Sequence, residues 1–238
     1  MTRAVAPRGI FVTGTDTEVG KTLAATVLMH HYRRQGLRVV GMKPVAAGCH
    51  ETPAGWKNED VEALLAASNV EAPIEAVNPY AFREPIAPHI AAKREGRTID
   101  LGRIVAGFEA LRALADMVVV EGAGGFLVPL NDAEDFGDLV QRLDLPVVLT
   151  VGLRLGCINH ALLTQEAIEA RGLRLDGWIA NRIDPRMSAS EENLDSLTAR
   201  LRAPLLGVIP YLEAVDAASI VLTRDIDLPP LGSSSPGA

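Results

Sequence analysis

The residues that could do chemistry begin with the run GTDTEVGKT at residues 14–22. A glycine-rich loop that ends in Gly-Lys-Thr is typical of phosphate sites, where backbone N–H groups surround the phosphates. The usual loop has four residues before its Gly-Lys-Ser/Thr, whereas five separate Gly14 from Gly20. The run therefore predicts a variant nucleotide site, in which Lys21 contacts the β- and γ-phosphates and the Thr22 hydroxyl faces Mg²⁺.

The segments around this loop have the pattern that a phosphate site requires. GIFVTG at 9–14 is typical of a buried strand, and KTLAATVLMHHYRRQG at 21–36 has apolar residues at helical spacing before a final glycine. The loop would thus join a strand to a helix N-terminus, where unpaired N–H groups and the helix dipole favour anions. The extra residue should bring Thr17 and Glu18 near the transferred phosphate.

Two more charged residues follow predicted strands. Glu121 ends the apolar run MVVVE, where a carboxylate can hold Mg²⁺ opposite Thr22. Lys43 follows the strand LRVVGM and precedes a proline, so the chain should be extended there, with the ammonium toward the ligand crevice. A second cation there could neutralise charge that develops during phosphoryl transfer. Asp60 stands at the start of a helical segment, and the sequence alone favours a helix cap over a metal ligand.

Further apolar runs predict the rest of a parallel sheet. Runs rich in Val and Ile without polar alternation are typical of strands covered on both faces, and here they alternate with helical segments. The predicted strands span 9–14, 37–42, 117–122, 146–152, 177–182 and 205–210, and the predicted helices span 21–36, 60–68, 102–115, 159–172 and 190–201. The expected fold is an α/β domain of P-loop NTPase type, with helices on both faces and ligands at the carboxyl ends of the strands.

Length and composition fit one soluble domain. The chain has 238 residues, 48% of them hydrophobic, and a formal net charge of -7, which argues against a broad basic surface for nucleic acid or an anionic membrane. Residues 1–228 are expected to form one domain, and 229–238, rich in Pro, Gly and Ser, a disordered tail. No secretory signal or membrane span is expected. Cys49 and Cys157 could in principle pair, but a reduced cytoplasmic protein is expected.

Taken together, the motifs resemble the dethiobiotin synthetase family. GTDTEVGKT, KPVAAG, NED, APHIAA, VEGAGG, GLRLGCINHALLT, NRIDP and GVIP occur in this order over residues 8–213, and the first loop with KPV and VEGAGG is the specific part of the match. The family's enzymes are homodimeric α/β proteins that convert 7,8-diaminononanoate, CO2 and Mg-ATP into dethiobiotin, ADP and phosphate. The resemblance implies a carbamate on one amine, its phosphorylation by ATP, and closure of a ureido ring by the second amine.

The resemblance also implies roles for individual residues. It gives catalytic roles to Lys43, Lys21 and Thr17, and it places Mg²⁺ among Thr22, Asp60 and Glu121, against the cap interpretation of Asp60. The other nucleotide-binding positions that it implies are Glu18, Val19, Gly20, Leu23, Gly122, Ala123, Gly124, Asn181, Arg182, Pro210, Tyr211 and Leu212. The diamine positions that it implies are Thr17, Lys43, Ala47, Gly124 and Asn159, the last of which would reach the substrate across the dimer interface.

One position departs from the family pattern. The family often has a hydroxyl residue where KPVAAG has Ala47. Alanine cannot make that hydrogen bond, whose loss costs on the order of 1 kcal/mol. The departure bears on diamine affinity rather than on the reaction.

Other interpretations of these motifs stay open. A P-loop ATPase that changes shape to act on a protein partner would share the loop, although Asp16 stands where partitioning ATPases carry an early lysine. The run NRID at 181–184 resembles a guanine-reading Asn-Lys-x-Asp motif, with Arg182 in place of the lysine, so preference among nucleotides is open. An amidotransferase-type synthetase would need a glutaminase domain for which the chain has no room, and the intact loop disfavours a catalytically silent binding module.

Overall fold

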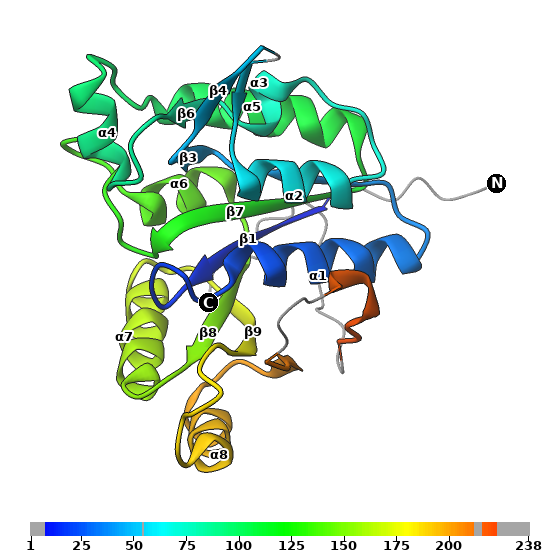
Figure 1. The fold of residues 1–238 in the computed structure, drawn as a ribbon, viewed down its shortest axis with the longest axis vertical. Coiled ribbons are helices and arrows are strands. Elements are labelled where there is room, and N and C mark those ends of the chain that lie inside the picture. The colour runs from blue at the N-terminus through cyan, green and yellow to red at the C-terminus, as the bar shows by residue number, and fades with distance from the viewer. Residues whose placement is uncertain (1–7, 54, 212–215, 223–238) are drawn as a thin grey trace.

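The structure, a computed structural model, describes residues 8–53, 55–211 and 216–222 (Figure 1). Its centre is a six-stranded parallel sheet in the order β10-β9-β8-β1-β7-β2. The strands are β1 (Arg8–Gly14), β2 (Val39–Met42), β7 (Met117–Gly125), β8 (Val147–Leu153), β9 (Leu175–Arg182) and β10 (Leu205–Ile209). Each lies at a predicted strand, so the predicted parallel sheet is confirmed. The tail predicted at 229–238 lies outside the described residues.

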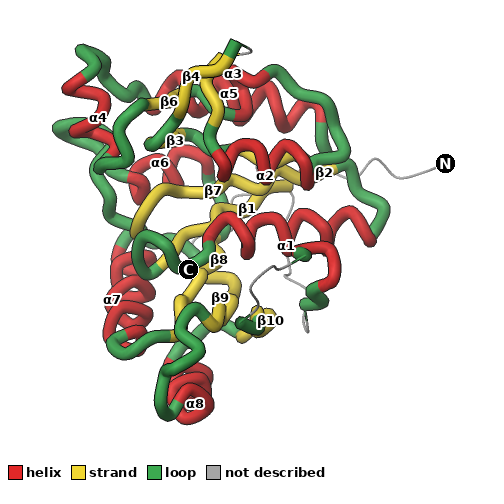
Figure 2. The backbone as a smooth tube through the Cα atoms, viewed as in Figure 1, coloured by secondary structure: helices red, strands yellow, loops and turns green. Residues whose placement is uncertain are grey.

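Helices cover both faces of the sheet, as predicted. One face carries α1 (Lys21–Arg34), α2 (Glu59–Ala67) and the 3-10 turn η1 (Ala217–Ser219), and the other carries α5 (Leu101–Leu114), α6 (Phe136–Leu143), α7 (Cys157–Ala170) and α8 (Ser190–Arg200). Figures 1 and 2 show α1 and α2 side by side in front of the sheet. Along β1, Ile10 and Val12 pack beneath α1, whereas Phe11 packs on the α5 and α6 side. Burial on both faces explains why the strands lack polar alternation.

The sequence patterns missed the short elements in the connections. These are β3 (Val45–Ala47), β4 (His50–Thr52), β5 (Gly55–Lys57), α3 (Ile74–Val77), β6 (Tyr80–Phe82), α4 (Pro88–Arg94) and α6. Strand β3 pairs in parallel with β6, and β4 pairs with β5 as an antiparallel hairpin. None of these elements is longer than the eight residues of α6, which is less than the window of about 11–18 residues over which hydrophobic periodicity identifies a helix.

The end of α1 follows its sequence signal. Gly36, predicted to stand just beyond the helix, has φ 82. In this left-handed conformation the N–H groups of Gly36 and Leu37 donate to carbonyls of the last helical turn. The glycine therefore stops the helix where the sequence predicts.

The order of the strands fixes where a ligand can bind. Strand β1 lies between β7 and β8, and β2 lies on the far side of β7. All run parallel, so the loop after β1 and the carboxyl ends of β2 and β7 meet at one edge. This is the edge at which open α/β sheets bind their ligands.

Two smaller expectations also concern the described residues. Cys49 and Cys157 are both buried free thiols, as expected of a reduced protein. Among the helices described, none combines the length and the apolar character needed to cross a bilayer.

Trp178 tests the packing between β9 and α8. Its side chain is fully buried, and its Nε1 has no hydrogen-bond partner in the described part of the chain. We expect Trp178→Ala to lower the free energy of unfolding by about 3–5 kcal/mol because it leaves a large cavity. Trp178→Phe should cost much less, because it keeps an aromatic ring and breaks no hydrogen bond. Chemical denaturation of both variants measures the difference, and equal losses would contradict the absence of a partner for Nε1.

Candidate functional site

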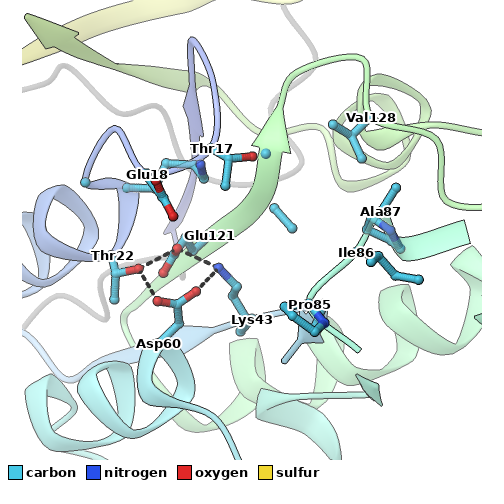
Figure 3. Close-up of a pocket in the computed structure, with 16 residues that line it drawn as sticks. Thr17, Glu18, Thr22, Lys43, Asp60, Pro85, Ile86, Ala87, Glu121 and Val128 are labelled. Carbon is cyan, nitrogen blue, oxygen red and sulfur yellow. Dashed lines mark hydrogen bonds and ion pairs between the residues drawn. The ribbon is translucent and has the colours of Figure 1, made fainter. Parts of the chain in front are cut away.

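The loop between β1 and α1 has the form of an anion site. Gly20 precedes α1 with φ 86, and no side chain caps the helix. Gly20, Lys21 and Thr22 line a cavity of about 610 Å³, drawn in Figure 3. The uncapped N–H groups of the first turn and the positive end of the helix dipole favour an anion there.

The loop is held from behind by Asn181 at the end of β9. Its Nδ2 donates to the Val19 carbonyl at 3.0 Å, and the side chain is buried. A Cβ on Gly20 would lie 2.1 Å from that same nitrogen. Space and the positive φ therefore both require glycine at this position.

Lys21 is folded back onto its own loop. Its Nζ donates to the Asp16 carbonyl at 2.8 Å, and the Asp16 carboxylate accepts from the Thr17 N–H and pairs with Arg154. Burial, helped by the positive charge of Lys43, lowers the pKa of Lys21 to about 8. A bound phosphate would supply the negative charge that this buried ammonium lacks.

Lys43, Asp60, Glu121 and Thr22 form one cluster on the cavity wall (Figure 3). The Lys43 Nζ lies 2.6 Å from Glu121 Oε1 and 2.7 Å from Asp60 Oδ2. The Thr22 hydroxyl lies 2.7 Å from Asp60 Oδ1 and 2.8 Å from Glu121 Oε1, and its single proton can go to only one of them at a time. The sheet edge thus brings together residues that follow β2, belong to β7, and begin α1 and α2.

Burial and the neighbouring charges together decide the charges of this cluster. Only 4% of the Lys43 side chain and 0% of the Glu121 side chain are exposed, against 41% for Asp60. Burial opposes charge on Lys43, but the two carboxylates outweigh it and raise the pKa of Lys43. Burial raises the pKa of Glu121 against the opposing effect of Lys43. For Asp60, burial is outweighed by Lys43 and Thr22, so its pKa is lowered.

The same cluster fits a divalent cation. Glu121 Oε2 is buried without a hydrogen-bond partner among the described residues, and a buried carboxylate oxygen needs a donor or a cation. With the Asp60 carboxylate and the Thr22 hydroxyl it forms an all-oxygen set, which suits Mg²⁺. The described residues hold no group of three or more His, Cys, Asp or Glu side chains suited to a metal. An ion here would therefore take its other ligands from phosphates and water.

The cap of α2 is Asn58, so the cap interpretation of Asp60, which the family resemblance opposes, is wrong. The Asn58 Oδ1 accepts from the N–H groups of Asp60 at 3.1 Å and Val61 at 3.3 Å. Its Nδ2 donates to the Ala47 carbonyl at 3.1 Å. Asp60 stands in the first turn, free to contact Lys43. Asparagine before an acidic first turn is itself a cap signal, and the motifs left it without a role.

The cavity brings together most of the predicted site. The predicted residues that line it are Thr17, Glu18, Gly20, Lys21, Thr22, Lys43, Ala47, Asp60, Glu121, Ala123 and Gly124. Thr17 and Gly124, both predicted for the diamine, are neighbours, because a Cβ on Gly124 would lie 3.7 Å from Thr17 Oγ1. This proximity arises because the loop after β1 faces the end of β7.

An apolar wall of the cavity was not predicted. It consists of Pro85, Ile86, Ala87, Pro88 and Val128. Figure 3 shows Ile86, Ala87 and Val128 on the side of the cavity away from Thr22 and Asp60. The run EPIAP between β6 and α4 has the apolar, proline-containing composition of such a wall, but its place depends on how the connection folds.

Other predicted residues do not line the cavity. These are Val19, Leu23, Gly122, Asn159, Asn181, Arg182, Pro210 and Tyr211, while Leu212 lies outside the described residues. Gly122 still contacts the cluster, because its carbonyl accepts from Lys43 Nζ at 3.2 Å. The Arg182 guanidinium is bonded to Ser190 and Glu191 at the start of α8. Asn159 is exposed on α7 and does not reach the cavity of its own chain.

Comparison with known proteins decides the family. A family model described as an AAA domain matches residues 8–219. The ATP-dependent dethiobiotin synthetase BioD of Aromatoleum aromaticum is 56% identical over 214 residues, which cover 90% of this chain and 95% of the relative. The chain belongs to the dethiobiotin synthetase family. The resemblance carried by the sequence motifs is therefore confirmed.

Solved structures show the fold of this dethiobiotin synthetase family member and nothing finer. A ParA family ATPase from Chlorobium tepidum TLS matches with a TM-score of 0.53 and 14% identity, over 88% of this chain and 86% of that one. The MinD cell division protein of Aquifex aeolicus matches with a TM-score of 0.50 and 18% identity, over 85% of this chain and 81% of that one. The predicted P-loop NTPase fold is thereby confirmed.

Gly20 tests the phosphate loop of the dethiobiotin synthetase family member. Gly20→Ala should lower kcat/KM for the nucleotide by about a hundredfold, because its Cβ would displace Asn181 and shift the loop by a fraction of an ångström or more. Steady-state kinetics over a range of nucleotide concentrations measures this loss.

Gly36→Ala is the matched control. Gly36 has φ 82, close to the 86 of Gly20, but nothing lies within 4 Å of its added Cβ. It should lose about 1–2 kcal/mol of stability and keep its kinetics. Equal kinetic losses in the two variants would show that φ strain alone, rather than the contact with Asn181, requires glycine in the loop.

Proposed function

We propose that the protein is an ATP-dependent dethiobiotin synthetase, which carboxylates 7,8-diaminononanoate with CO2 and closes its ureido ring. One observation carries the proposal: a single cavity holds a phosphate loop and an ammonium–carboxylate cluster on one side, and an apolar wall on the other. A triphosphate suits the first side and the aliphatic chain of a diamine suits the second. Membership of the family supports the same substrates. An ATPase that switches a protein partner would not need the apolar wall.

ATP is the proposed phosphoryl donor. Glu18 to Leu23 surround its phosphates, with Lys21 on the transferred group, and this rests on the uncapped start of α1. The adenine is assigned to the carboxyl ends of β9 and β10, where Asn181, Arg182, Pro210 and Tyr211 lie. Buried Asn181 already holds the phosphate loop through the Val19 carbonyl. One residue would therefore position both the adenine base and the phosphates.

Thr22, Asp60 and Glu121 are the proposed holders of Mg²⁺. The unpartnered Glu121 Oε2 and the all-oxygen donor set support this assignment. A bound ion would neutralise charge on the β- and γ-phosphate oxygens. The residues themselves provide the orientation, because Thr22 is the second residue of α1 and Glu121 is rigidly buried in β7.

The proposed reaction begins with the diamine between Thr17, Gly124 and Lys43, its chain on Ile86 and Val128. An unprotonated amine attacks CO2, forming a C–N bond, and loses its proton to give a carbamate. A carbamate oxygen attacks the γ-phosphorus as the bond to ADP breaks. The second amine attacks the activated carbon, phosphate leaves with the bonding electrons, and loss of the amine proton completes the ring.

The two lysines explain why two anions can react here. The carbamate and the triphosphate repel each other, and Lys21 and Lys43 both line the cavity in which they would meet. Lys43 is buried with its charge sustained by carboxylates, so it acts in a site of low dielectric, where its attraction for a developing anion is strong. Holding the reactants in line also removes much of the entropic barrier.

A homodimer is the proposed assembly, with the diamine site completed by the second chain. Asn159, assigned to the diamine by the family pattern, is exposed on α7 and outside the cavity of its own chain. Leu155, just before α7, is 93% exposed, and Leu163, about one helical turn after Asn159, is 60% exposed. Exposed apolar side chains around a polar one support a contact surface between protein chains.

The experiment that tests the function is direct. The purified protein is incubated with Mg-ATP, bicarbonate and 7,8-diaminononanoate, while mass spectrometry follows dethiobiotin and a phosphate assay follows ATP use. Dethiobiotin and phosphate should appear in equal amounts, and removal of Mg²⁺ by EDTA should stop both. Phosphate release that ignores the diamine, without product, would favour the ATPase switch instead.

Lys43→Gln tests the buried ammonium. We expect kcat to fall by about a thousandfold, because a preorganised charge beside the carbamate is lost. Lys93→Gln on α4 is the control, since Lys93 is exposed and does not line the cavity, and it should keep full activity. Product formation by both variants is measured at saturating substrates. A Lys43→Gln variant with normal kcat would remove Lys43 from the mechanism.

Ala47→Ser tests the departure from the family pattern. Ala47 lines the cavity, so a serine hydroxyl there could bond the diamine. We expect the KM for the diamine to fall about fivefold, the value of one hydrogen bond of about 1 kcal/mol. The KM for ATP should stay unchanged and serves as the internal control. An unchanged diamine KM would mean that another group already makes this bond.

A further inference from the structure

The side chain of Asn58 makes three hydrogen bonds at one junction. Its Oδ1 accepts from the N–H groups of Asp60 and Val61, at 3.1 and 3.3 Å, while its Nδ2 donates to the Ala47 carbonyl at 3.1 Å. Its own carbonyl accepts from the N–H of Glu62 at 2.9 Å, which starts α2. The Oδ1, the Nδ2 and the backbone carbonyl of Asn58 thus all take part in hydrogen bonds.

The hydrogen-bond partners of Asn58 belong to two different parts of the cavity. Asp60 belongs to the Lys43–Glu121–Thr22 cluster, whereas Ala47 lines the cavity at the end of β3. One rigid amide thus joins the helix that carries the cluster carboxylate to the strand that carries a diamine-facing residue. A movement of the helix would be transmitted to the strand, because the oxygen and the nitrogen of one amide cannot move independently of each other.

Asn58 also closes the base of a surface hairpin. Residues 48–57, between Ala47 and Asn58, contain the hairpin of β4 and β5. The hairpin carries Trp56, which is 42% exposed with the Arg83 guanidinium 5.0 Å from its ring centre. Arg83 stands just before the apolar wall at 85–88. The hairpin therefore contacts the segment that leads into this wall.

We propose that Asn58 is a positioning residue. Through its hydrogen bonds to the Asp60 N–H and the Ala47 carbonyl, it fixes the proposed Mg²⁺ ligand Asp60 relative to Ala47 in the proposed diamine site. The inference rests on the function proposed above. A plain helix cap uses only an acceptor, and Ser, Thr or Asp would serve as well. Asparagine alone among the good caps offers an acceptor and an amide donor together, and this structure uses both.

The test compares Asn58→Ala with Asn58→Asp. In Asn58→Ala both connections are lost, and the Kd of Mg²⁺ for the ADP-saturated protein and the KM for the diamine should each rise about tenfold. Asn58→Asp keeps the acceptor at the helix start, where a negative charge is favourable. It cannot donate to the Ala47 carbonyl, so its Mg²⁺ Kd should be no weaker than that of the wild type while its diamine KM stays raised. Calorimetry gives the Kd and steady-state kinetics gives the KM.

Asp100→Ala is the matched control for a cap. Asp100 caps α5 through a 2.8 Å bond from the Gly102 N–H and does not line the cavity. Both alanine variants should lower Tm by about 3 °C, as loss of a cap predicts, but Asp100→Ala should move neither Kd nor KM. The proposal is overturned if Asn58→Ala behaves like Asp100→Ala, or if Asn58→Asp restores the diamine KM. Should Asn58→Ala fail to fold, the diamine KM of the capped Asn58→Asp variant decides.

The two proposals fail separately. If the wild type makes no dethiobiotin, the proposed function falls, while the Mg²⁺ Kd of the Asn58 variants, measured without diamine, still decides the role of Asn58 toward Asp60. If the wild type makes dethiobiotin and Asn58→Ala keeps the wild-type Kd and KM, the function stands and the positioning role falls.

Discussion

The ion pairs of Lys43 with Glu121 and Asp60 are the interaction on which the cavity depends. Glu121 has a fully buried side chain and Asp60 approaches the same ammonium, and removing that charge would leave the buried Glu121 carboxylate uncompensated. The sheet makes the contact possible, because β2 and β7 are adjacent and parallel. Residues 78 apart in the chain thereby meet at 2.6 Å, and the loop after β1 closes around them.

The cavity separates its two tasks in space. Charged groups and helix N–H groups gather where the strands of the central sheet end, and rigid burial fixes them. Most of the apolar wall comes from the connection between β6 and the start of α4, outside that sheet, and Val128 after β7 completes it. In the proposed function, the sheet edge therefore holds the phosphates of the nucleotide, and the apolar wall holds the organic substrate.

This division also sets what the sequence could predict. The six central strands were predictable because burial on both faces leaves a continuous apolar run, and Lys43 and Glu121 were predictable because they stand at strand ends. The wall was missed because elements of three to seven residues carry no periodicity, and tertiary contacts place them, such as the packing of Gly48 against Pro85. The sequence alone does not separate Asn58 from Asp60 as the cap of α2, because both residue types cap helices and the choice depends on where the helix begins. The role proposed for Asn159 involves a second chain, which no pattern within one chain describes.

The hydrogen bonds that the main chain of Ala47 makes have an evolutionary consequence. Its main chain carries the structure, by pairing with β6 opposite Phe82 and by accepting from Asn58. Ala47 also lines the cavity, where a methyl group is all that its side chain offers. Mutation can therefore change what a ligand meets at this position without disturbing the fold around it. A lineage can drift between a hydroxyl and a methyl here, so that substrate affinity evolves independently of stability.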